Sequence, residues 1–142
     1  MDQVLQDKLF EKYSEFFSNK DLGPRNSCMA FGIECGNGWY DIIDLICYKI
    51  QSRNKTIKER NRLIDGNNEE VIDFKFDQIK EKFGGLRVYY SGGDDRVRGL
   101  VDMAEMMSYK MCEVCGNRGN PNKGGWIITL CDSCRSKNEQ GL

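Results

Sequence analysis

The sequence predicts an α+β fold: a small sheet or hairpin packed with three helices, followed by a C-terminal four-cysteine lobe. Three observations predict it. Apolar residues recur at helical spacing in three segments, alternate with polar residues in a fourth, and are followed by two Cys-x2-Cys pairs. With 142 residues, the chain is long enough for one modest core. We expect an α+β core over 1–110 and a metal-binding lobe over 111–142, packed together as one unit.

The first helix is expected over residues 3–18, because apolar side chains there fall on one helical face: Leu5, Leu9, Tyr13, Phe16 and Phe17. The Gly23-Pro24 pair cannot continue a helix and ends it. Residues 28–35 mix small and apolar side chains ahead of a Gly-Asn-Gly turn, which predicts a short strand. A second helix follows the turn and is marked by a 3.6-residue stripe of Ile42, Ile43, Ile46, Cys47 and Ile50.

Residues 53–70 predict a polar excursion between core elements, because five basic residues and one acidic residue precede a turn rich in Asp, Asn and Gly. From residue 72 onward, apolar and charged residues alternate, which predicts a half-buried strand that resumes after a bulge. Gly84-Gly85 then reverses the chain into a second strand. On that strand, residues 86, 88 and 90 should face the core, and Arg87 and Tyr89 the opposite side.

The third helix is expected after Asp94 and Asp95, whose negative charges suit a helix start. Its apolar positions recur at helical spacing and delineate a single face: Val97, Leu100, Val101, Ala104 and Met107. This helix leads directly into the first cysteine pair.

The cysteine pairs predict a metal site. Two residues separate the members of each pair and fifteen separate the pairs, so each short knuckle can present two sulfurs to one tetrahedral ion. The predicted ligands are Cys112, Cys115, Cys131 and Cys134. We expect structural Zn²⁺ in a zinc-ribbon or treble-clef-like lobe, with two disulfides or an iron–sulfur cluster as alternatives. Four protein thiolates leave no coordination position open for catalysis.

Three further cysteines lie outside these pairs. Cys47 falls on the apolar stripe of the second helix, where a thiol usually packs as a small hydrophobe. Cys28 and Cys35 have the same interpretation, with a second metal site as the alternative.

Catalysis is not expected, because the chain has no histidine, the commonest general base near neutral pH. We therefore predict that the protein is not an enzyme. The alternative is a magnesium-dependent enzyme that uses carboxylates, which suit hard cations; the candidates are Asp73, Asp77, Asp94 and Asp95.

A candidate ligand site lies in the predicted hairpin, where glycines, basic groups and aromatic rings occur together, as in sites that hold a phosphate and stack a base. The candidate residues are Lys80, Lys82, Gly84, Gly85, Arg87 and Tyr89. The alternative is a hairpin whose turns require glycine. Two other features have open interpretations: the basic segment 53–62 could contact phosphates or acidic protein, and Trp126 could pack in the core or anchor a partner.

Charge and hydropathy limit the partners. Twenty-one basic and twenty-two acidic residues give a net charge of −1, which excludes long-range attraction to nucleic acid or anionic lipid by bulk charge. The start of the chain does not resemble a secretion signal, and no apolar run reaches membrane-spanning length, so we expect a cytoplasmic protein without membrane partners. Nucleic-acid binding by the lobe is an alternative, through Arg118, Lys123, Arg135 and Lys137.

The hairpin motif 81–90, the third helix, the Cys112-to-Gly116 knuckle and the tract 125–131 together resemble a family of small uncharacterised proteins of phages, prophages and bacteria. The resemblance covers residues 72–135. It implies a phage accessory protein, which would act in the host cytoplasm and bind and disable a host factor. The predicted function is therefore a zinc-stabilised binding protein that sequesters a nucleotide-like immune signal or inhibits a host defence protein.

Overall fold

The protein has the predicted α+β class. The computed structural model describes residues 1–139, in which four helices accompany five strands in two small sheets. The helices are α1 (Gln3–Lys12), α2 (Tyr40–Leu63), α3 (Asp95–Ser108) and α4 (Asp132–Glu139). The main sheet contains β1 (Ile33–Glu34), β2 (Phe74–Lys82) and β3 (Gly85–Gly92), and the second sheet pairs β4 (Asn120–Pro121) with β5 (Thr129–Leu130).

The main sheet is the predicted hairpin with one short strand added. β2 and β3 are antiparallel, and β1 pairs with β2 in parallel, Ile33 opposite Ile79. A register shift between Phe76 and Gln78 confirms the predicted bulge. The extra residue changes the phase of the strand, so that Phe74, Phe76 and Ile79 are all buried although their spacing is not uniformly two.

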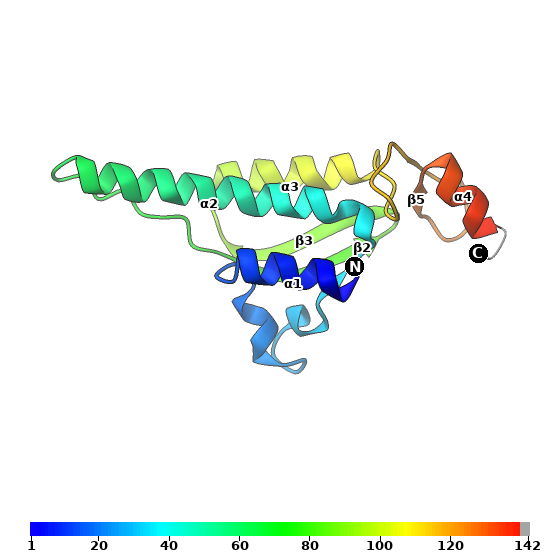
Figure 1. Ribbon diagram of the computed structural model, residues 1–142, viewed down its shortest axis with the longest axis horizontal. Coiled ribbons are helices and arrows are strands. Elements are labelled where there is room, and N and C mark those ends of the chain that lie inside the picture. Colours follow the sequence, from blue (N-terminus) through cyan, green and yellow to red (C-terminus); the bar gives the residue numbers. More distant parts are fainter. Residues whose placement is uncertain (140–142) are drawn as a thin grey trace.

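The core lies between this sheet and the helices. Figure 1 shows α2 and α3 side by side along the hairpin, with α1 below the hairpin in this view and nearer the viewer. Aromatic rings join the N-terminal segment to β2: Phe17 stacks on Phe76 with 4.7 Å between centroids, and Phe16 meets Phe74 edge-on at 5.7 Å. These contacts fix α1 and the turn after it against the sheet.

The first helix ends earlier than predicted, at Lys12. Tyr13, Phe16 and Phe17 are buried as expected, but all three lie in turns after the helix. The N–H groups of Phe16 and Phe17 donate three residues back, to Tyr13 and Ser14, and the carbonyl of Phe16 accepts from the N–H of Phe76 on β2 at 2.8 Å, which ties this turn to the sheet. Leu5 is only partly buried.

The strand predicted over residues 28–35 is mostly wrong. The structure has a 3-10 helix over Cys28–Phe31 and only the two-residue strand β1. The Ser27 hydroxyl accepts from the Met29 N–H and caps the 3-10 helix, which ends at Gly32 with φ +77°.

The first half of the predicted polar excursion at 53–70 is helical, because α2 continues to Leu63 before the turn at residues 65–66. Lys, Arg, Glu and Gln form helices well, so a polar continuation costs little. Buried Asn54 holds the returning chain alongside: its side chain accepts from the Ile72 N–H at 2.7 Å and donates to the Ile72 carbonyl at 2.9 Å. Asn61 similarly bonds the backbone of Glu69.

Helix α3 covers the free edge of β3. The Ser108 hydroxyl accepts from the Leu86 N–H, and the Glu105 carboxylate accepts from the Val88 N–H, both at 2.8 Å. An edge strand thus loses its unpaired donors. The buried face of α3 includes Val97, Val101, Ala104 and Ser108, whereas Met107, predicted on that face, is 49% exposed.

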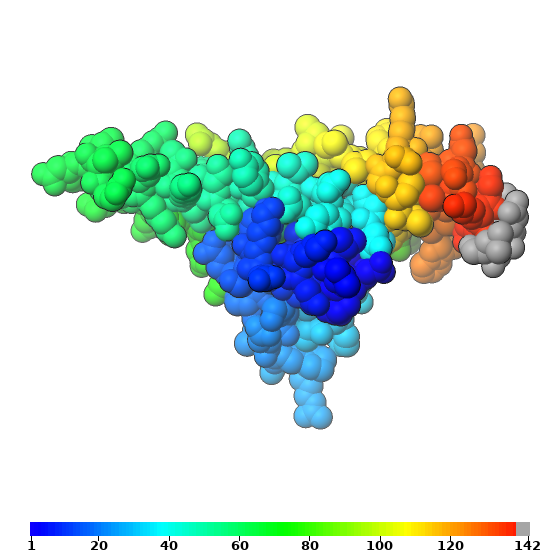
Figure 2. Space-filling view, in the orientation of Figure 1, coloured from blue at the N-terminus to red at the C-terminus, as the bar shows by residue number. Residues whose placement is uncertain are grey.

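The molecule is elongated in Figure 2, with the end of α2 and its following turn at one extreme and the four-cysteine lobe at the other. Among residues 1–139, none of the helices combines the length and apolar composition needed to cross a lipid bilayer.

Candidate metal centre

The structure brings the four predicted ligand cysteines together. Their sulfur atoms all lie within 4.8 Å of one another, and the Sγ atoms of Cys115 and Cys131 are 3.6 Å apart. With zinc–sulfur bonds of about 2.3 Å, the sulfurs of a tetrahedral site are about 3.8 Å apart. This spacing fits four sulfurs around a single ion. It is far longer than a disulfide bond of about 2.05 Å, and an iron–sulfur cluster would spread its ligands over several irons.

Local backbone hydrogen bonds shape both pairs. The Gly116 N–H donates to the Cys112 carbonyl at 2.8 Å, and the chain reverses at Gly116 with φ +77°, a conformation that favours glycine. In the second pair, the Cys134 N–H donates to the sulfur of Cys131 at 3.4 Å, in the first turn of α4. The order of knuckle, short hairpin and helix matches the treble-clef-like alternative.

Electrostatics favour a cation at the centre. Burial raises the pKa of the Cys112 thiol, but backbone N–H groups, above all that of Cys131, outweigh burial and lower it to about 7. Hydrogen bonding with the neighbouring sulfurs of Cys115 and Cys131 raises the pKa of Cys134 to about 12. Four adjacent thiolates repel one another, and a divalent cation between them would offset their charge.

The lobe is attached to the core at two places, of which the first is the turn before α2. The Gly38 N–H donates to the Glu113 carbonyl at 2.7 Å, and the Gly36 N–H to the Glu113 carboxylate at 2.9 Å. The indole of Trp39, fully buried, donates to the Met111 carbonyl at 3.0 Å. The Glu113 and Met111 carbonyls and the Glu113 carboxylate thus accept hydrogen bonds from donors of residues 36–39 in the core.

The second attachment is the hairpin turn. The buried Thr129 hydroxyl donates to the Gly84 carbonyl at 2.5 Å, and the Thr129 carbonyl accepts from the Glu113 N–H at 2.9 Å. Space at both hairpin glycines is taken by neighbours: a Cβ at Gly84 would lie 2.8 Å from Ile127, and one at Gly85 would lie 2.3 Å from Tyr109.

Four of the six candidate ligand residues of the hairpin share one face of the sheet, because Lys80 lies opposite Arg87 in the strand register and Lys82 and Tyr89 are two residues from them. Lys80 lies over the ring of Tyr89, 5.4 Å from its centroid, and Lys82 lies over Phe83 at the same distance. Arg87 donates to the Tyr109 hydroxyl at 2.6 Å and lies 4.0 Å from Glu105. Gly84 and Gly85 face the lobe and α3, so the glycines join parts of the fold.

Sequence reasoning missed Phe83. It is the non-glycine residue with positive φ in residues 1–139, at +54°, and with Gly84 at +75° it forms the two-residue turn between β2 and β3. Bulky side chains are rarely found in this conformation. Its ring is 67% exposed. The signal available in sequence was a phenylalanine where such turns usually carry Asn, Asp or Gly.

The acidic alternative finds no shared site. Asp94 caps α3 and pairs with Arg53, and Asp95 pairs with Arg98. Asp77 accepts from Asn19 and Ser91, and so has different partners from Asp94 and Asp95. Within residues 1–139, the four cysteines are the group of three or more potential metal ligands that the fold gathers.

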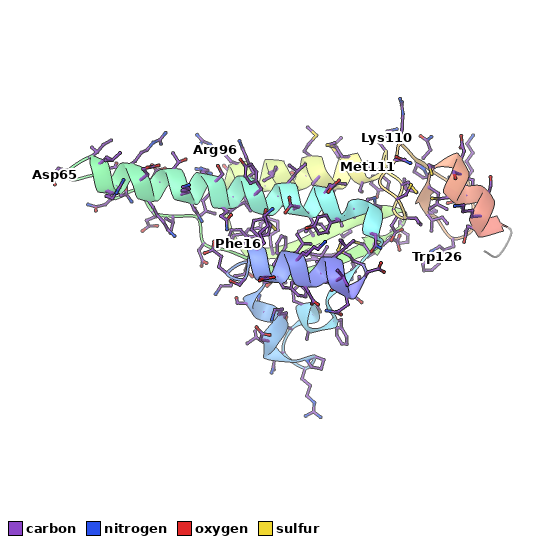
Figure 3. The ribbon with its side chains drawn as sticks, in the orientation of Figure 1. Phe16, Asp65, Arg96, Lys110, Met111 and Trp126 are labelled. Carbon is purple, nitrogen blue, oxygen red and sulfur yellow. The ribbon has the colours of Figure 1, made fainter. Side chains whose placement is uncertain are left out.

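The remaining sequence candidates have other surroundings. Arg135 donates to the Asn120 carbonyl at 2.7 Å, so this candidate nucleic-acid contact has a structural partner. Cys35 and Cys47 are buried, and burial raises the pKa of Cys35 to about 12 and that of Cys47 well above its usual range; Cys28 is exposed. Trp126 is 80% exposed and projects from the edge of the lobe (Figure 3).

Comparison with protein-family models, curated proteins and solved structures found no match to this chain.

Proposed function

We propose that the four cysteines hold one zinc ion, and that this ion has a structural role. Two observations support the proposal: the sulfur spacing suits a tetrahedral ion, and all four donors are protein thiolates. Binding of zinc to such sites contributes about 10 kcal/mol or more to folding. Elemental analysis of the reduced, purified protein should find one zinc per chain. A chain without stoichiometric metal, or one that holds iron, would contradict this proposal.

We further propose a non-enzymatic binding protein whose contact surface is the tip surface, formed by Phe83, Trp126 and Ile127. The positive φ of Phe83 carries the proposal. A bulky residue in this conformation costs about 1–2 kcal/mol, which the fold tolerates although the ring gains no burial. Conformational strain at an exposed aromatic side chain is typical of functional contacts.

The three residues of the tip surface come from neighbouring backbone. Ile127 lies against Gly84, immediately after Phe83, and Trp126 precedes Ile127. Exposed aromatic anchors commonly dominate the energy of protein interfaces. The partner we propose is a protein with an apolar pocket for these rings. On the basis of the resemblance to phage and prophage proteins, we propose that the partner is a host defence protein and that this chain inhibits it on binding.

The test compares four proteins in capture from a bacterial host lysate: wild type, Phe83→Gly, Trp126→Ala and the control Phe31→Ala. Phe31 is similarly exposed, at 63%, but belongs to the 3-10 helix over Cys28–Phe31. We expect wild type and Phe31→Ala to capture the same host protein. Once purified, that host protein should bind Phe83→Gly and Trp126→Ala at least tenfold more weakly than it binds wild type.

Phe83→Gly also separates binding from folding. Because glycine relaxes the turn, this variant should unfold at an equal or higher temperature than wild type while it loses the partner. If the wild type and all three variants capture the same proteins, the tip surface is refuted and the zinc proposal stands.

A further inference from the structure

A second candidate site lies between α2 and α3, far along the molecule from the metal centre. An open groove with a cavity of about 540 Å³ runs between the two helices and the chain that returns from α2. Small-molecule sites commonly have volumes of about 300–1,000 Å³. Figure 3 shows Arg96 at the start of α3, beside the middle of α2, where the groove lies.

Cationic side chains line this groove from both helices. Lys49, Arg53 and Arg60, together with Thr56, fall at steps of four, three and four along α2, so they form one stripe on that helix. Arg96 approaches from α3. Over residues 49–62, six basic residues accompany one acidic residue, in a chain whose net charge is −1. The positive charge is therefore concentrated along this helix.

Part of that charge has no internal partner. Arg53 pairs with Asp94 at 2.6 Å, and Arg60 lies 3.8 Å from Glu69. The ion pairs found within residues 1–139 include neither Lys49 nor Arg96. Lys49 and Arg96, on opposite walls, thus remain available for an anion. Arg53 and Arg60 can replace their partly exposed carboxylate partners with that anion.

The floor of the groove is apolar. Ile50, Ile57 and Val97 are buried beneath it, each 2% exposed, so the apolar surface that a ligand can contact belongs to the partly buried Ile72 and Leu100. The hydroxyl groups of Ser52 and Thr56 add polar contacts between floor and rim. A simple inorganic anion would leave this floor unused, whereas a ligand with both an anionic group and a flat apolar part would contact floor and rim together.

We propose that the groove between α2 and α3 binds a nucleotide-sized phosphorylated ligand, with phosphate on Lys49, Arg53, Arg60 and Arg96 and the base against the apolar side chains of Ile72 and Leu100. Guanidinium groups bind phosphate through paired N–H donors, and aliphatic side chains cover a heterocycle by dispersion. The site differs from the hairpin candidates predicted in sequence and does not depend on the tip surface.

A nucleotide fits better than a long nucleic acid. Glu69 lines the groove and Asp94 pairs with Arg53 beside it, so both would repel the phosphates of a chain that continues past the groove. The net charge of −1 likewise gives no general attraction to a polyanion.

The test uses the full-length zinc-loaded protein and four probes: ATP, cyclic di-AMP, ADP-ribose and pyrophosphate. Binding is measured by equilibrium dialysis and by the rise in unfolding temperature with probe concentration. The test variant is Lys49→Glu/Arg96→Glu. The control variant is Lys55→Glu/Arg62→Glu, which makes the same change in charge on exposed α2 residues outside the groove.

We expect one nucleotide to saturate a single site, to bind the test variant at least tenfold more weakly, and to bind the control within threefold of wild type. Pyrophosphate should bind more weakly than that nucleotide because it lacks the base. The proposal is refuted if no probe saturates below 1 mM, if the two variants lose affinity equally, or if only RNA binds and its affinity grows with length.

Discussion

The contact between Gly38 and the first cysteine pair offers a direct measurement of how firmly the lobe is held. A Cβ atom at position 38 would lie 2.1 Å from the Cys112 carbonyl oxygen and 2.4 Å from the Gly116 nitrogen. Both atoms are backbone, and real Cβ atoms essentially never approach within 3.0 Å. In Gly38→Ala, the knuckle must therefore move by about 1 Å relative to the core, a displacement that close packing does not absorb.

The size of the effect follows from the hydrogen bonds at this contact. Three donors of the core meet acceptors of the lobe there: Gly36 N–H, Gly38 N–H and the Trp39 indole, at 2.9, 2.7 and 3.0 Å. Each bond contributes about 1 kcal/mol. Losing all three lowers the free energy of unfolding by about 3 kcal/mol, or the midpoint by about 6–12 °C in a chain of this size.

Gly99→Ala is the matched control, since it makes the same chemical change in the middle of α3, where a Cβ meets nothing within 4 Å. Alanine should raise stability there by about 0.5–1 kcal/mol. Thermal unfolding followed by circular dichroism, with zinc content measured in parallel, compares the variants. If Gly38→Ala unfolds at the wild-type temperature and retains its metal, the lobe is not seated on residues 36–39 as described.

Two further predictions concern thiols and pH. In the zinc-loaded native protein, Ellman's reagent should rapidly modify one cysteine, the exposed Cys28, and after metal removal it should modify five. Cys35 and Cys47 should stay unreactive because they are buried and their pKa values are raised. Rapid reaction of all seven cysteines before denaturation would contradict this. Asp94→Ala should cost about 1 kcal/mol at pH 7, as a lost helix cap. Backbone hydrogen bonding to Val97, then Arg53, lowers the pKa of Asp94 below 3.8, so its stabilisation is present above that pH and disappears as pH falls through the lowered pKa. The wild-type-minus-variant difference in unfolding temperature should therefore shrink between pH 5 and pH 2; a constant difference would refute the assignment to charge.

Sequence periodicity succeeded where one local rule governed a whole element. The stripe in α2, the alternation in β2 and the cysteine spacing each correspond to a feature of the structure. The errors arise where a distant residue takes over a backbone group. The turn that holds Phe16 is tied to β2 through the Phe16 carbonyl, and on the inner face of α3 the Ser108 hydroxyl accepts from the Leu86 N–H of β3. Helical spacing alone contains no information about such partners.

The loop around Trp126 is set by one side chain and not by β propensity. The β-branched and apolar residues 127–130 favour a strand, but the structure has strand only over Thr129–Leu130. The Asn122 side chain instead organises the loop: it accepts from the Ile128 N–H at 2.7 Å and donates to the Trp126 carbonyl at 2.9 Å. A single side chain thus satisfies backbone groups that a longer strand would have paired, and the indole is left in solvent.

The hairpin motif acquires a different meaning once these partners are known. Glycines beside basic and aromatic residues suggested a phosphate site, yet the Gly84 N–H donates to Glu81 and the Gly84 carbonyl accepts from Thr129. Both polar groups of Gly84 are used within the fold, so this glycine does not offer its N–H to an anion. The two cations that form no ion pair within residues 1–139, Lys49 and Arg96, lie instead on α2 and α3, at the groove. Phosphate recognition is therefore better supported in the groove. At the hairpin, the notable exposed residue is Phe83, whose backbone has a positive φ.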